Sequence, residues 1–203
     1  MGLKDHEDLE ISIKGMKLVI RNGIFNPDPK LTNSTAIILN NLQNVKGKDI
    51  LDVGCGSGII GIYCILHGAR KVVATDTDEK AILNTQENAN RNKVEKKMKT
   101  FQSDLFENVS GKFDYIFGNL PIVDKAWNLN ILTKDLMKNF ISASLGYLKK
   151  DGCVFVVWLE NADILRDYLK EKNYNFEEIT EKRLGKVWFL FKIEHGKLQD
   201  NRI

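Results

Sequence analysis

Short apolar runs alternate with amphipathic stretches along most of the chain. The apolar runs are typical of strands, and the stretches between them repeat apolar residues at helical spacing. The pattern predicts strands over residues 49–53, 71–75, 98–102, 113–117, 153–159, 176–180 and 187–193. It predicts helices over residues 59–67, 78–92, 132–152 and 162–172. Strands that alternate with helices through short links favour a parallel sheet covered on both faces.

The last two predicted strands are joined by a short loop around Gly185. A parallel pair needs a long crossover connection, so these two strands are predicted to be antiparallel. The sequence therefore predicts an α/β protein with an open, mostly parallel sheet that ends in an antiparallel C-terminal hairpin.

The first 45 residues follow another pattern. Residues 9–20 alternate around Lys14-Gly15, which predicts a small hairpin. Two prolines then interrupt regular structure, and one of the polar residues 32–34 can cap a helix that runs to about Leu42. We divide the chain into an N-terminal accessory segment, residues 1–45, a main domain, residues 46–195, and a C-terminal tail, residues 196–203.

The composition fits one globular domain of 203 residues, 43% of them hydrophobic, with a net charge of +3. That weak excess does not establish nucleic-acid binding. No run of eighteen apolar residues is present, and the first residues are too polar for a signal peptide. Cys55, Cys64 and Cys153 lie far apart and are expected to be free thiols in the core, and no Cys/His spacing indicates a metal site. We expect a cytoplasmic protein.

A glycine-rich turn follows the first strand of the main domain. The stretch LDVGCGSGIIG, residues 51–61, holds four glycines and one carboxylate. In a doubly wound sheet the ligand lies beyond the carboxyl ends of the strands, and glycines there allow positive φ and close approach of the ligand. Gly54, Gly56 and Gly58 are therefore candidate ligand contacts.

Two classes of ligand compete for this turn. Gly56 to Gly61 matches G-x-G-x-x-G, and Asp76 follows twenty residues later, as in dinucleotide sites. Against a dinucleotide stands Asp52 at the strand end, because its carboxylate would repel a pyrophosphate. S-adenosylmethionine carries an ammonium and a sulfonium, which the same carboxylate attracts. The alternative role for Asp52 is a carboxylate that forms the turn.

Two further carboxylates end the next strands. Asp76 can accept both hydroxyls of a ribose, which suits either ligand. Asp104 is placed to accept from the exocyclic amine of an adenine, although Asp and Ser also simply begin turns.

The order D-x-G-x-G-x-G, an acidic residue ending the next strand, then S-D-L, resembles class I S-adenosylmethionine-dependent methyltransferases. The resemblance spans about residues 49–193 and implies a doubly wound, Rossmann-like sheet of seven strands. It implies that Asp52, Gly54, Gly56 and Gly58 surround the methionine part, that Asp76 holds the ribose, and that Asp104 with Leu105 holds the adenine. Cys55, Thr77 and Asn119 complete the expected donor-binding set.

The fourth strand ends in FGNLPIVDKAW, residues 117–127. Its N-L-P-I resembles the N-P-P-Y signature of methyltransferases that modify glutamine amides or exocyclic amines of nucleobases. The Asn119 and Leu120 carbonyls can accept the two N–H bonds of such a nitrogen, and Pro121 stiffens the turn. These three residues are the predicted catalytic set. Leu120 replaces the first proline, and Ile122 replaces the aromatic residue of the signature.

The segment LTNSTAIIL is similar to the Thr-rich segment of ribosomal-protein methyltransferases, so Thr32 or Thr35 is expected to contact the donor. Trp127 can supply a ring to the acceptor, and Asp124 is the nearby carboxylate that can take a proton. No His, Cys or carboxylate constellation indicates hydrolysis or a covalent intermediate.

The sequence predicts a methyltransferase that uses S-adenosylmethionine, releases S-adenosylhomocysteine and needs no metal. The predicted acceptor is macromolecular: a nitrogen of a protein side chain, such as a glutamine or lysine of a ribosomal or release-factor-like protein, or an exocyclic amine in RNA. Nothing indicates DNA or a membrane. The alternatives are an NAD-dependent oxidoreductase and a non-catalytic binding protein with the methyltransferase fold.

Overall fold

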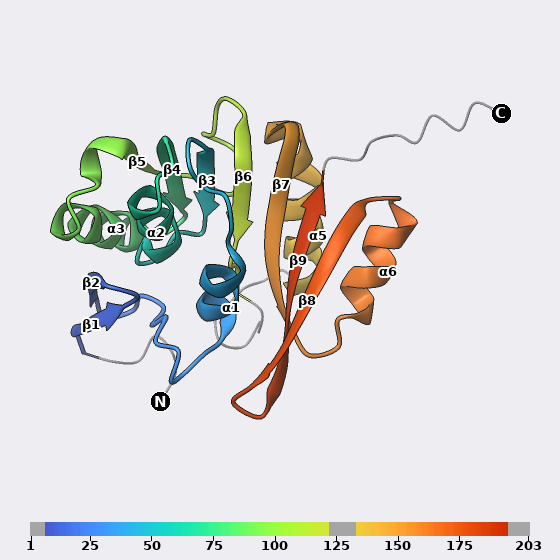
Figure 1. Ribbon diagram of the computed structural model, residues 1–203, viewed down its shortest axis with the longest axis horizontal. Helices are drawn as coiled ribbons and strands as arrows, with labels where there is room; N and C mark the ends of the chain where they lie inside the picture. Colours follow the sequence, from blue (N-terminus) through green and yellow to red (C-terminus); the bar gives the residue numbers. More distant parts are fainter. Residues whose placement is uncertain (1–6, 122–132, 195–203) are drawn as a thin grey trace.

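Seven strands form one sheet in the order β5-β4-β3-β6-β7-β9-β8 (Figure 1). The computed structural model describes residues 7–121 and 133–194. Neighbours among β3 to β7 are parallel, whereas β9 is antiparallel to both β7 and β8. The predicted fold class is therefore confirmed. The strands are β3 (Asp49–Val53), β4 (Lys71–Asp76), β5 (Met98–Gln102), β6 (Phe113–Gly118), β7 (Leu148–Leu159), β8 (Asn175–Arg183) and β9 (Lys186–Glu194).

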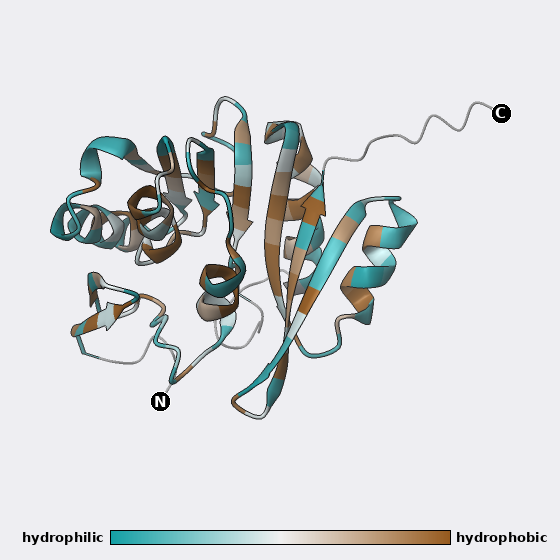
Figure 2. Cartoon of the chain, in the orientation of Figure 1, coloured by the Kyte–Doolittle hydropathy of each residue, from teal (hydrophilic) through white to brown (hydrophobic). Residues whose placement is uncertain are grey.

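Helices cover both faces of the sheet. Residues of α2 (Ile59–Leu66) and α3 (Glu79–Arg91) pack into the core of one face, and those of α5 (Thr133–Ser144) and α6 (Asp163–Glu171) into the core of the other. Two short 3-10 turns, Glu95–Lys97 and Leu145–Tyr147, lead into β5 and β7. Apolar residues concentrate on the inner strands, whereas the edge strand β8 is largely polar, which protects an open edge from pairing with another chain (Figure 2).

The N-terminal segment forms the predicted hairpin and helix. Strands β1 (Leu9–Ile13) and β2 (Met16–Ile20) pair antiparallel in a sheet of their own, and α1 (Ser34–Asn41) follows. Figure 1 shows the hairpin and α1 on the side toward which β6 points, at the carboxyl ends of the central strands. Asn33 is the N-cap residue of α1 but makes no capping bond; its amide donates to Glu181 of β8 instead.

The strand order reverses at β3, because β4 and β5 lie on one side of it and β6 on the other. In register, Val53 lies between Thr75 and Gly118, so the segments that follow β3, β4 and β6 leave the sheet together. Ser103 follows at the end of β5 and donates its N–H to the Asp76 carbonyl at 2.9 Å. All predicted site residues in the described part of the chain therefore lie at or beside one edge of the sheet.

One predicted helix end is wrong. The helix expected to reach Gly152 ends at Ser144, and Leu148 to Gly152 belong to β7. Gly152 is a place of close backbone approach: a Cβ there would lie 3.0 Å from the carbonyl oxygens of Phe113 and Asp114 on β6. The pairing of β6 and β7 shifts register at this point, an irregularity that the apolar spacing does not reveal.

The extended start of β7 places Lys149 at the amino edge of the sheet. Its ammonium lies 2.9 Å from an oxygen of the buried Asp49 and 2.7 Å from one of Asp114, and Arg70 also pairs with Asp49. This ionic cluster ties β3, β6 and β7 together at the edge opposite the glycine turn.

Cys55, Cys64 and Cys153 are buried free thiols, as expected. Among the residues that the structure describes, no helix is long and apolar enough to cross a membrane, and no group of His, Cys, Asp or Glu is arranged to hold a metal ion.

We expect Gly118→Ala to destabilise the fold by about 1–3 kcal/mol, because the new Cβ would lie 2.4 Å from the ring of the buried Phe140. Gly146→Ala is the matched control, since a Cβ there meets nothing within 4 Å. Urea unfolding of both variants measures the difference. Equal stability of the two would contradict the packing argument.

Candidate functional site

The glycine turn is fixed to the end of β4. The N–H groups of Gly54 and Cys55 both donate to the carbonyl of Thr75, at 2.8 and 2.9 Å. Gly54, Gly56 and Gly58 all have positive φ, at +71°, +55° and +76°. These are left-handed conformations that residues with a Cβ adopt only with strain.

The three glycines have different surroundings. A Cβ on Gly58 would lie 2.7 Å from the Thr85 side chain, and a Cβ on Gly54 would lie 2.9 Å from Leu120. A Cβ on Gly56 would meet nothing within 4 Å. The turn is thus packed against α3 and the segment after β6, and it is open at Gly56, where a ligand can approach the backbone.

Asp76 joins the turn to the start of α3. One carboxylate oxygen accepts from the N–H of Gly56 and the other from the N–H of Asp78, each at 3.0 Å. Carboxylate oxygens accept from hydroxyl groups, and Asp76 is half-buried at the strand end. Its contact with a ribose stays a prediction.

Asp52 lies beneath the turn. Its side chain is 1% exposed and accepts from the N–H of Gly61 at 3.1 Å. Burial raises the pKa of Asp52 to about 7; the Gly61 bond opposes this rise and the charge of Asp76 adds to it. Any effect of Asp52 on a ligand above the turn would act through its charge, so direct contact with an ammonium stays a prediction.

Asp104 and Leu105 follow β5 at the same edge. Asp104 is exposed, its carbonyl accepts from the N–H of Glu107, and Leu105 has a left-handed φ of +43°. Thr77, after β4, is also exposed, and its carbonyl accepts from Gln102 at 2.7 Å. The structure thus brings the predicted ribose and adenine residues to neighbouring strand ends.

The segment after β6 lies across from the turn. Leu120 is buried beside Gly54, and the half-buried Asn119 donates its side-chain N–H to the Thr35 hydroxyl at 3.2 Å. The Thr32 hydroxyl instead donates to Ser34 at 3.3 Å. Whether either threonine contacts the donor stays a prediction. Of the other predicted residues, Ile122, Asp124 and Trp127 lie outside the described residues.

Cys55 in the turn is poorly suited to act as a nucleophile. Its sulfur is buried, burial raises the pKa of the thiol well above its ordinary value, and the charges of Asp52 and Asp76 act in the same direction. The thiolate form that covalent catalysis requires is therefore disfavoured.

Two residues of α3 that hold the turn were missed by the sequence analysis. Thr85 donates to the Gly56 carbonyl at 3.0 Å, and Asn88 donates to the Ser57 carbonyl at 2.9 Å. Both side chains are completely buried. The available signal was polar residues at helical spacing next to a glycine turn, which resembles an ordinary solvated helix face.

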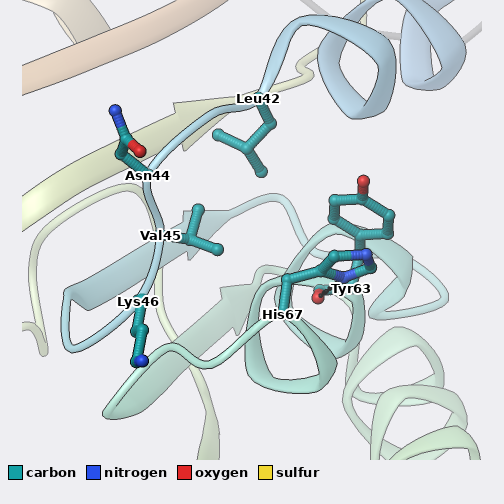
Figure 3. Close-up of a pocket in the computed structure, with 6 residues that line it drawn as sticks. All are labelled: Leu42, Asn44, Val45, Lys46, Tyr63 and His67. Carbon is teal, nitrogen blue, oxygen red and sulfur yellow. Dashed lines mark hydrogen bonds between the residues drawn. The ribbon is translucent and has the colours of Figure 1, made fainter.

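A small pocket lies elsewhere, at the amino edge of the sheet between the end of α2 and the segment before β3 (Figure 3). Its walls include the stacked rings of Tyr63 and His67, whose centroids are 3.8 Å apart. The glycine turn lies at the opposite, carboxyl edge of the sheet. None of the predicted site residues lines the pocket.

The fold recurs in solved methyltransferases. A methyltransferase from Pyrococcus furiosus matches with a TM-score of 0.74 and 18% identity, over 91% of this chain and 91% of its own. A second structure, SMU.776, provisionally named a methyltransferase, contains S-adenosylhomocysteine and matches with a TM-score of 0.75 and 12% identity over 93% of this chain and 56% of its own. The molecule thus has the Rossmann-like fold of the methyltransferases.

The family follows from sequence comparison. Residues 15–188 match the family described as Methyltransferase small domain, and the chain belongs to this family of S-adenosylmethionine-dependent methyltransferases. This match supports a transferase rather than the dinucleotide-dependent alternative.

Two curated relatives are close in sequence. A Methanocaldococcus jannaschii protein, provisionally named a protein N5-glutamine methyltransferase, is 35% identical over 72% of this chain and 78% of its own. The ribosomal protein L11 methyltransferase of Thermosipho africanus is 39% identical over 65% of this chain. The match spans 44% of that enzyme, less than half of its length.

Replacing Asp52 by Asn should change how stability depends on pH. The pKa of Asp52 is about 7 in the folded chain and about 4 when unfolded, so the folded state binds this proton more tightly. The resulting stabilisation is complete below about pH 4 and is lost as pH rises through 7. Between pH 4 and 8 the free energy of unfolding of the wild type should fall by about 1–4 kcal/mol relative to that of Asp52→Asn. Urea unfolding of both proteins across this pH range measures the difference. The same pH dependence in both would contradict the raised pKa of Asp52.

Proposed function

We propose that the chain binds S-adenosylmethionine over the glycine turn and transfers its methyl group to a side-chain amide nitrogen of a protein. The observation that carries this proposal is the position of Asn119 and Leu120, which follow β6 directly opposite the turn, with Leu120 in contact distance of Gly54. Donor site and acceptor site thus share one edge of the sheet.

The residues present suit this donor. The backbone is open at Gly56, the Asp76 carboxylate is an acceptor group beside the turn, and Asp104 with Leu105 follows the adjacent strand. A dinucleotide would need N–H groups of the turn for its pyrophosphate. Here the Gly56 N–H is bound by the Asp76 carboxylate and the Gly58 N–H by the Cys55 carbonyl. Negative side chains at the turn favour a cationic ligand.

The acceptor is positioned by the segment after β6. The bound donor supplies an electrophilic methyl group. Asn119 gives its side-chain N–H to Thr35, which leaves its carbonyl oxygen as the atom that can accept from a substrate. This oxygen and the Leu120 carbonyl would accept the two N–H bonds of an amide and aim the nitrogen at the methyl group. Catalysis would then rest on orientation, without a strong base.

A protein amide is favoured over an RNA base for two reasons. The Methanocaldococcus jannaschii relative, of which the chain covers 78%, has protein N5-glutamine in its name. In addition, the exposed side chains Asp78 and Asp104 add negative charge beside the turn, which repels a phosphate backbone. An exocyclic amine of RNA remains the alternative outcome of the experiment.

Transfer of tritium from labelled donor into fractionated cell extract tests the proposal. Labelled product that protease destroys and ribonuclease spares supports a protein acceptor, and the reverse result identifies RNA. Binding of S-adenosylhomocysteine without transfer to any fraction would instead favour the non-catalytic binding protein. Binding of NAD in place of S-adenosylhomocysteine would overturn the donor assignment.

We expect Asn119→Ala to lower the rate of transfer about 100-fold or more, because it removes a hydrogen-bond acceptor that positions the nitrogen. Affinity for S-adenosylhomocysteine should fall much less than the rate, because the other residues of the expected donor-binding set remain. The exposed Asn90→Ala serves as the matched control. Initial rates and calorimetric titration measure the two effects. Equal rates in both variants would remove Asn119 from the catalytic set.

Replacing Asp76 by Ala should weaken binding of S-adenosylhomocysteine by about 1.5–3 kcal/mol, the range for losing hydrogen bonds to a charged group. Asp78→Ala is the control, because the Asp78 carboxylate caps α3 by accepting from the Lys80 N–H. Asp78→Ala should lower the free energy of unfolding by about 1 kcal/mol and leave binding of S-adenosylhomocysteine unchanged. An unaltered dissociation constant for Asp76→Ala would place the ribose elsewhere.

A further inference from the structure

Two asparagines on α3 and a third at its C-cap bind the edge of β2 as a neighbouring strand would. Their side-chain amides bind the main chain of every second residue, from Lys17 in β2 to Arg21 directly after it. The contacts pair Asn92 with Lys17, Asn88 with Val19, and Asn84 with Val19 and Arg21. Four helical residues rise about 6 Å and two strand residues about 6.6 Å, so the two rows stay in register. We call these three residues the asparagine ladder.

Asn88 differs from the other two members of the ladder. Its oxygen accepts the Val19 N–H at 2.8 Å, one of its N–H bonds goes to the Val19 carbonyl, and the other goes to Ser57 in the glycine turn, both at 2.9 Å. The side chain is completely buried, so water cannot replace these partners. A single amide therefore joins the hairpin to the turn.

The remainder of the N-terminal segment is fixed at the acceptor side, where Thr35 accepts from Asn119. Both halves of the site thus touch residues 1–45, the acceptor half through Thr35 and the donor half through Asn88. Asn84, which is equally buried, binds the hairpin but makes no bond to the turn among the described residues.

We propose that Asn88 is a positioning residue that couples docking of the β1–β2 hairpin to donor binding by the glycine turn. The inference rests on the proposed function only in taking the turn as the donor site. Coupling between two sites is reciprocal. If the docked hairpin favours the donor-binding shape of the turn, a bound donor must hold the hairpin more firmly.

The test uses the full chain and S-adenosylhomocysteine as the probe, with Asn88→Ala, the milder Asn88→Ser, and Asn84→Ala as the buried control. Calorimetry gives the dissociation constants. Hydrogen exchange at the Lys17 and Arg21 amides, which Asn92 and Asn84 hold, reports hairpin docking with and without ligand. Circular dichroism verifies folding, and Asn88→Ser carries the test if Asn88→Ala does not fold.

We expect the Asn88 variants to bind S-adenosylhomocysteine about 5- to 50-fold more weakly. The control should stay within about threefold, because Asn88 and Asn92 still hold the hairpin and Asn88 still holds the turn. In the wild type the ligand should slow exchange at Lys17, and the Asn88 variants should lose this slowing while Asn84→Ala keeps it. Wild-type affinity in the Asn88 variants, or equal weakening in the control, would overturn the coupling alone. A wild-type chain that does not bind the probe would overturn the proposed function itself.

Discussion

The bond between the Asp76 carboxylate and the Gly56 N–H is the contact on which the site depends. A turn that contains three glycines loses much conformational entropy when it is ordered, and its own side chains cannot hold it. Its shape must come from outside, and it is supplied by the end of β4 through Thr75 and Asp76 and by α3 through Thr85 and Asn88. The shape of the turn, the proposed donor site, therefore depends on β4 and α3 as well as on the turn itself.

Charge is divided between the two edges of the sheet. Carboxylates gather at the carboxyl edge, with Asp52 below the turn and Asp76 beside it, whereas Lys149 and Arg70 neutralise the buried Asp49 at the amino edge. Burial raises the pKa of the Cys55 thiol, and the negative charges of this edge raise it further, which favours the protonated form. One charge arrangement thus suits a cationic ligand and suppresses competing thiol chemistry.

Much of the fold could be predicted from the sequence because buried strands are short apolar runs, and a loop too short for a crossover specifies an antiparallel pair. Gly152 misled the prediction because its role is close contact between two backbones, which leaves no trace in apolar spacing. Candidate residues at strand ends were found because sheet topology gathers them. Asp52 shows the limit of prediction from sequence, because the motif gives its position in the chain but not the burial of its side chain. The role of Asn88 was not predicted because a sequence does not distinguish a buried amide from a solvated one.

The asparagine ladder recognises the main chain of β2, since each of its bonds to the hairpin ends on a backbone N–H or carbonyl. Docking by this route places few demands on which side chains the hairpin carries at its outward positions. Those positions are open to engineering, so that the same main-chain attachment can carry different outward surfaces.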